Sequence, residues 1–128
     1  MTQTYHGSCH CGQVTYEIDA DLSKLVRCTC SICTKKGGLF VRLPPARFRL
    51  LSGAEDLTAY QFNTGTAKHL FCKHCGVHPF GHPRTDPEAY LVNVRCLDDF
   101  DLEAAAPEIE IFDGRNWEAA FAAARNRS

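Results

Sequence analysis

The chain has 128 residues and a mass of 14.3 kDa, the size of one ordinary domain, and we expect residues 1–128 to form a single domain. Its 45% hydrophobic and 23% charged residues are typical of a globular protein, and no apolar run approaches the roughly 20 residues that span a bilayer. A net charge of −1 offers no basic surface for nucleic acid, so binding to nucleic acid and insertion into a membrane are both disfavoured.

Residues 1–7 are polar and lack the apolar core of a signal peptide, so we expect the chain to stay in the reducing cytoplasm. Residues 7–12 are typical of a turn. Residues 13–18 then alternate apolar and polar side chains, the pattern of a half-buried strand whose apolar members face the core. These inward-facing residues are Val14, Tyr16 and Ile18.

Further short strands follow at close spacing, interrupted by glycine, proline and asparagine. The expected strands cover residues 39–43, 48–51, 57–62, 67–72, 89–95 and 108–112. Only the tail has helical spacing, with Trp117, Ala120, Phe121 and Ala124 on one face. The sequence therefore predicts a mainly β fold of antiparallel sheets with a short C-terminal helix.

The cysteines form the most informative pattern. Cys72 and Cys75 are separated by two residues and followed by a glycine, a spacing that lets both sulfurs reach one metal ion. Cys9 and Cys11, also followed by a glycine, are the best candidates for the other half of the same site. A zinc site with four thiolate ligands is favoured over a redox pair at Cys72 and Cys75, or free buried thiols.

A second group, Cys28, Cys30 and Cys33, places three thiols within six residues, in what we expect to be a loop between strands. We favour a second zinc ion with these three ligands and one open coordination position, as catalytic zinc sites have. The alternative is a closed site that also uses Cys96, although a lone cysteine is more often a buried apolar residue. The prediction is thus two zinc ions per chain, one structural and one catalytic.

With these groups assembled, the sequence resembles the glutathione-dependent formaldehyde-activating enzyme family, and within it the centromere protein V-like branch. The residues that carry the resemblance are GSCHCG (7–12), CTCSIC (28–33), FRLLSGAE (48–55), YQFNT (60–64), FCKHCGV (71–77), NVRCLD (93–98) and the tail pair Trp117 and Glu118.

The resemblance implies an Mss4-like sheet assembly and the same two zinc sites. It also implies a carbon–sulfur lyase, in which glutathione thiol adds to formaldehyde to give S-hydroxymethylglutathione, or the adduct is cleaved. A small thiol such as glutathione and an aldehyde are the expected partners, with Cys28, Cys30 and Cys33 as the catalytic residues. The alternative function is a non-catalytic zinc module that binds a protein partner, as the Mss4-like fold can.

Other side chains have two interpretations each. Lys35 and Lys36 could attract an anionic substrate or lie in a solvated loop, and the loop is favoured. His74, His78 and His82 could relay protons but more often lie at the surface, where we also expect His10. Asn93 could orient a substrate or satisfy backbone groups, and core packing is favoured for Trp117 and Phe121 over a pocket wall.

Overall fold

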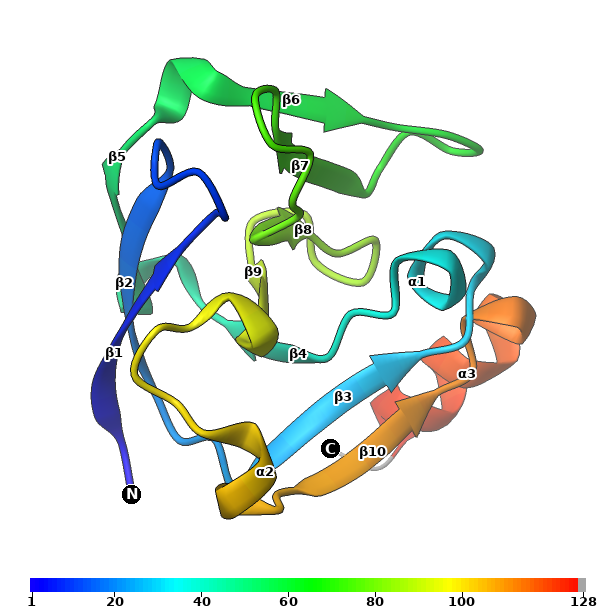
Figure 1. Cartoon of the computed structure of the whole chain (residues 1–128). Helices are drawn as coiled ribbons and strands as arrows, with labels where there is room; N and C mark the ends of the chain where they lie inside the picture. The colour runs from blue at the N-terminus through cyan, green and yellow to red at the C-terminus, as the bar shows by residue number, and fades with distance from the viewer. Residues whose placement is uncertain (127–128) are drawn as a thin grey trace.

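The computed structural model describes the backbone of residues 1–126 and the side chains of residues 1–123, and it contains two β sheets. The smaller sheet has the strand order β1-β2-β5, and the larger has the order β10-β3-β4-β9-β8-β7-β6. Figure 1 shows the smaller sheet beside the larger one, with α1 and α3 near the ends of β3 and β10.

The strands are β1 (Gln3–Ser8), β2 (Thr15–Ala20), β3 (Lys24–Cys28), β4 (Phe40–Leu43), β5 (Phe48–Ser52), β6 (Leu57–Tyr60), β7 (Lys68–Cys72), β8 (Phe80–His82), β9 (Tyr90–Asn93) and β10 (Glu108–Phe112). The helices are α1 (Ser31–Lys36), α2 (Leu102–Ala105) and α3 (Trp117–Asn126). Short 3₁₀ turns cover Pro45–Arg47, Ala54–Asp56, Val94–Cys96 and Gly114–Asn116. The predicted mainly β fold with a short C-terminal helix is confirmed.

The predicted inward face of β2 and the residue before it is also confirmed, because Val14, Tyr16 and Ile18 have no exposed surface. Strands β1, β3 and β8 were not predicted, and β1 has a polar sequence in which three of the six residues are exposed. It forms because each of its residues pairs with β2 in an antiparallel register, from Gln3 opposite Ala20 onwards. Pairing with a neighbour, rather than burial of its own side chains, makes this segment a strand.

One pair of strands departs from the predicted antiparallel arrangement. β10 runs parallel to β3, with Ile109 beside Leu25 and Phe112 beside Cys28. The described connection from β9 to β10 includes a 3₁₀ turn and α2, which is long enough to return the chain in the same direction as β3. Both strands therefore end at the same place, next to α1.

An aromatic cluster joins the two sheets. Tyr16 of β2 stacks on Phe48 of β5 with ring centroids 5.4 Å apart, and Phe48 stacks on Tyr90 of β9 at 4.0 Å. Phe80 of β8 meets Tyr16 edge-on at 5.3 Å. Such pairs add about 0.5–1.5 kcal/mol each beyond the burial of apolar area, so this cluster sets how the sheets lie against each other.

Helix α3 begins where the helical spacing predicts, and Trp117, Ala120 and Phe121 are its half-buried residues. The side chain of Ala124, predicted on the same face, lies outside the described residues. Among residues 1–126, no helix is long and apolar enough to cross a membrane.

Gly53 gives a test of how tightly the small sheet closes. Its φ angle is +88°, and a Cβ there would lie 2.4 Å from the Gln13 backbone oxygen. We expect Gly53→Ala to lower the free energy of unfolding by about 3 kcal/mol, because the strain of a left-handed backbone at alanine adds to the clash of its Cβ with the Gln13 backbone. Gly65→Ala is the matched control, since its φ is +70° and nothing lies within 4 Å, so only about 1 kcal/mol is expected. Urea denaturation measures both, and equal losses would contradict the clash.

Candidate metal centres

The structure brings Cys9, Cys11, Cys72 and Cys75 together, although up to 61 residues separate contacting sulfurs. All four Sγ atoms lie within 4.8 Å of one another, and the Cys11 sulfur is 3.6 Å from those of both Cys9 and Cys72. Four sulfurs bound to one zinc at about 2.3 Å lie roughly 3.8 Å apart. This four-cysteine group therefore fits a closed tetrahedral zinc site.

Two similar turns present these sulfurs. In the first, the Gly12 N–H donates to the Cys9 carbonyl at 3.2 Å, and in the second the Gly76 N–H donates to the Cys72 carbonyl at 2.8 Å. Both glycines have positive φ, +83° and +76°, which explains why glycine ends each motif. The Val14 N–H also donates to the Cys9 sulfur at 3.4 Å, a contact that favours a thiolate.

The three-cysteine group, Cys28, Cys30 and Cys33, also has all its sulfurs within 4.8 Å of one another. The expectation that it lies in a loop is wrong. Cys28 ends β3, Cys30 is the N-terminal cap residue of α1, and Cys33 is buried within that helix. A helix of six residues is too short to show periodicity, and Gly37 marks its end, donating its N–H to the Cys33 carbonyl with φ of +68°.

The segment after β10 holds this group in place through Thr29. The Thr29 N–H donates to the Phe112 carbonyl at 3.0 Å, and its hydroxyl donates to Asp113 at 2.7 Å. Arg115 Nε donates to the Thr29 carbonyl at 3.0 Å. Gly114 comes so close that a Cβ there would lie 2.6 Å from the Cys28 sulfur. The residue between the first two cysteines is thus fixed at its N–H, its carbonyl and its hydroxyl.

The chemistry of the three sulfurs fits a thiophilic cation. Hydrogen bonding to the Cys28 and Cys30 sulfurs, together with burial, raises the pKa of the Cys33 thiol well above its usual value. Without a cation the group therefore resists full ionisation, whereas a divalent ion such as zinc binds cysteine as thiolate. Among the described residues, no fourth Cys, His, Asp or Glu joins the group.

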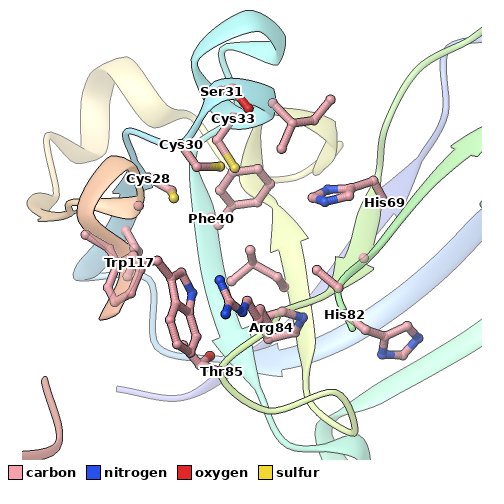
Figure 2. A pocket seen from close by; sticks show the side chains of 18 of the residues that line it. Cys28, Cys30, Ser31, Cys33, Phe40, His69, His82, Arg84, Thr85 and Trp117 are labelled. Carbon is pink, nitrogen blue, oxygen red and sulfur yellow. The ribbon is translucent and has the colours of Figure 1, made fainter. Parts of the chain in front are cut away.

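The three-cysteine group opens into a cavity of about 800 Å³, which we call the pocket (Figure 2). Its walls come from strands β3, β4, β7, β8, β9 and β10, helices α1 and α3, and the loops at residues 62–67 and 83–85. None of the four-cysteine group lines it. One candidate metal centre therefore faces the pocket and the other does not.

The pocket is cationic. Five basic side chains line it, and Glu110 is the one carboxylate among the lining side chains that the structure describes. The basic residues are Lys36, Arg42, Lys68, Arg84 and Arg115. Part of this charge is compensated, since Arg84 lies 3.2 Å from Glu118 and Arg42 lies 3.5 Å from Asp86. The remainder favours an anionic ligand.

The two lysines that follow the three-cysteine group differ in exposure. Lys35 is exposed, as expected for a solvated loop, but Lys36 is half-buried and lines the pocket. Its ammonium lies 3.1 Å from His69 Nδ1 and 5.8 Å from the centroid of the Phe40 ring. Burial lowers the pKa of Lys36. For Lys36, the solvated-loop interpretation was wrong.

Histidines also line the pocket. His78 and His82, two of the three histidines considered as proton relays, are among them. Their Nδ1 atoms contact the backbone carbonyls of Leu70 and Ala89, respectively. Burial lowers the pKa of His78 to about 4. His74 lies elsewhere, with Nε2 2.8 Å from Asp56, and His10 is exposed as expected.

His69, which sequence reasoning missed, points into the pocket from β7 (Figure 2). Burial lowers the pKa of His69 to about 4. The signal that could have found it is weak, because a histidine in a predicted strand indicates a site only when the facing element is known.

Asn93 and Cys96 have structural roles. The Asn93 amide donates to the His78 carbonyl at 3.1 Å and accepts from the Arg95 N–H at 3.2 Å, so it satisfies backbone groups. The Cys96 thiol lies 3.7 Å from the same carbonyl and belongs to neither cysteine group among the described residues. Burial raises the pKa of Cys96 to about 11, which keeps it a neutral thiol.

Trp117 and Phe121 form a wall of the pocket rather than part of the core. Their rings stack at 4.7 Å, and the Arg84 guanidinium carbon lies 3.7 Å from the centroid of the Trp117 ring (Figure 2). The Arg84 contact and its ion pair with Glu118 tie α3 to the loop after β8. The core-packing interpretation was therefore wrong for this pair.

Comparison with known proteins agrees with this arrangement. A crystal structure of a Rhodobacter sphaeroides protein is 37% identical, with a TM-score of 0.75, and the match covers 81% of this chain and 97% of that chain. The family described as glutathione-dependent formaldehyde-activating enzyme matches residues 4–115, which include all eight cysteines. The chain belongs to the family of glutathione-dependent formaldehyde-activating enzymes.

Proposed function

We propose that the protein is a zinc-dependent carbon–sulfur lyase that forms or cleaves thiol–aldehyde adducts, with S-hydroxymethylglutathione as the family example. The observation that carries this proposal is that the three-cysteine group opens into a cationic pocket while the four-cysteine group does not. The two cysteine groups would then have different roles. The four-cysteine group would hold a structural zinc ion, and Cys28, Cys30 and Cys33 would hold a catalytic one.

The proposal includes the organisation of the chain and its compartment. Residues 1–128 would act as one domain, because one aromatic cluster joins the two sheets and the pocket draws walls from β3 through to α3. All eight cysteines are free thiols in the structure. Thiolate ligands require a reducing environment, so the cytoplasm is the proposed location.

Cys28, Cys30 and Cys33 would hold the zinc ion and leave one position for a substrate thiol, and the ion would supply the chemistry that lowers the pKa of that thiol. The protein's own part is to hold both reactants. The Thr29 contacts fix the cysteine ligands, and basic side chains of the pocket such as Lys68 hold the carboxylates of an anionic thiol such as glutathione.

The bond changes are simple. The thiolate sulfur adds to the carbonyl carbon of the aldehyde, a carbon–sulfur bond forms, and the carbonyl oxygen takes up a proton. In the reverse direction the hydroxyl loses that proton and the carbon–sulfur bond breaks, which returns the aldehyde and the thiolate. No oxidant or reductant is needed, so beside the metal ion the pocket has to supply only charge, orientation and a proton.

The division of the two cysteine groups predicts different outcomes for two matched variants. The wild-type chain should bind two zinc ions. Cys72→Ala should lose cooperative unfolding, because a structural zinc ion supplies on the order of 10 kcal/mol of folding free energy. Cys30→Ala should keep its fold and one zinc ion, while the rate of exchange between free thiol and thiol–aldehyde adduct falls at least about 100-fold. Metal analysis and thermal unfolding measure these outcomes, and equal loss of folding in both variants would contradict the division.

The activity itself can be followed by NMR exchange spectroscopy of formaldehyde with glutathione, 2-mercaptoethanol and other small thiols. We expect the zinc-loaded protein to accelerate exchange between free thiol and adduct, and most strongly for an anionic thiol. Acceleration for none of the thiols would contradict the lyase and favour the non-catalytic module that binds a protein partner.

The cationic pocket predicts a preference that depends on charge. Lys68 lines the pocket and Lys35 does not, although both are exposed lysines. Lys68→Ala should raise KM for glutathione about threefold, as expected for one partly screened ionic contact, and leave KM for 2-mercaptoethanol unchanged. Lys35→Ala is the control and should change neither KM. Equal effects of Lys68→Ala on both thiols would show that its charge does not select the substrate.

A further inference from the structure

Lys36 occupies a special place on α1. It lies three residues after Cys33, so the two side chains share one face of the helix, and both line the pocket. Lys35, one position earlier, is turned to solvent. The helix that carries the last sulfur of the three-cysteine group therefore also delivers an ammonium group to the same cavity.

The surroundings of this ammonium are unusual for a half-buried cation. Among the described residues, the ion pairs give Lys36 no carboxylate partner. Its contacts are His69 Nδ1 at 3.1 Å and the Phe40 ring at 5.8 Å. Moving a cation out of water without a paired anion costs free energy. The position of the Lys36 ammonium is therefore explained if negative charge reaches the pocket. Cys28, Cys30 and Cys33 as thiolates on a divalent ion, together with a substrate thiolate, would supply that charge.

His69 fixes the direction of the ammonium. An ammonium group only donates hydrogen bonds, so His69 Nδ1 must accept, and the proton of the neutral ring then lies on Nε2. Burial holds the pKa of His69 at about 4, which keeps the ring neutral at physiological pH. Phe62 stacks on the same ring at 5.6 Å and limits its rotation. His69, in strand β7, thus presents a fixed hydrogen-bond acceptor to Lys36.

We propose that Lys36 is a catalytic residue that donates a proton to the carbonyl oxygen of the aldehyde, and that His69 is a positioning residue that holds Lys36 for this step. The inference rests on the proposed lyase function. As the thiolate sulfur bonds to the carbonyl carbon, the carbonyl π electrons move to oxygen, and oxygen takes a proton from the Lys36 ammonium. The neutral amine regains a proton from water. In cleavage the amine takes the hydroxyl proton as the carbon–sulfur bond breaks.

The test compares Lys36→Met with Lys35→Met in the zinc-loaded full chain, using glutathione and formaldehyde exchange. Lys36→Met should lower kcat about 100-fold, the usual size of a general acid–base contribution, with KM for glutathione changed less than threefold. Lys35→Met should match the wild type. Metal analysis and thermal unfolding should show two zinc ions and an unchanged fold in both variants.

Lys36→Arg separates proton donation from charge, because a guanidinium keeps the charge but does not release a proton near neutral pH. We expect it to stay at least about 20-fold below the wild type in kcat. Full recovery by arginine, or a rise in KM at constant kcat in Lys36→Met, would overturn the proton-donor role. A wild type that accelerates no exchange overturns the lyase proposal and this one together, whereas an active wild type equalled by Lys36→Met overturns only this one.

The role of His69 needs a readout that a merely structural residue would not move. His69→Asn keeps an acceptor oxygen near the position of Nδ1, and His69→Leu does not. We expect Asn to retain kcat within about threefold and Leu to lose about 30-fold. In ¹⁵N NMR of the wild type, His69 should be the neutral Nε2–H tautomer, and Lys36→Met should disturb that preference. Equal kcat in the Asn and Leu variants, or a protonated ring at neutral pH, would overturn the positioning role.

Discussion

The contact between two cysteine–glycine turns, whose residues Cys11 and Cys72 are 61 positions apart in the sequence, is the constraint on which the rest of the arrangement depends. The first turn follows β1 and the second follows β7, so their contact ties the smaller sheet to one strand of the larger. Strand β7 then carries His69 to the pocket, in register opposite Gly81 of β8. A metal ion on the four sulfurs would act as a cross-link that lowers the entropy of the unfolded chain, and it would fix the pocket wall at the same time.

The second constraint is the parallel pairing of β3 and β10, which ends both strands at the three-cysteine group. It brings Gly114 against the Cys28 sulfur and lets the segment after β10 hold Thr29 on several sides. The same segment leads directly into α3, whose aromatic pair forms the neighbouring wall of the pocket. The three-cysteine group and one side of the pocket therefore both depend on this pair of strands, and a shift of β10 would change both.

The sequence predicted those features that are local. Alternation identified most strands, because a half-buried strand shows its burial at every second residue, and cysteine spacing identified the sulfur groups, because a turn of two or three residues sets that spacing. It missed β1, a polar strand made by pairing, the short strands β3 and β8, and α1, which is too short for periodicity. It also missed the contact between Lys36 and His69, since 33 residues separate them and only the packing of α1 across from β7 brings them together.

The open position of the three-cysteine group was inferred from sequence by exclusion, and Cys96 was the residue that could close it. The structure supplies an independent argument, because the Cys96 thiol contacts the His78 carbonyl and, among the described residues, belongs to neither cysteine group. Three thiolates on a divalent ion leave one net negative charge, and a substrate thiolate adds a second. In the proposed reaction Lys36 would face that charge, because no carboxylate among the described residues pairs with it. Its proton would be held most firmly when the thiol binds, and it would become available as the new carbon–sulfur bond moves charge from sulfur to oxygen.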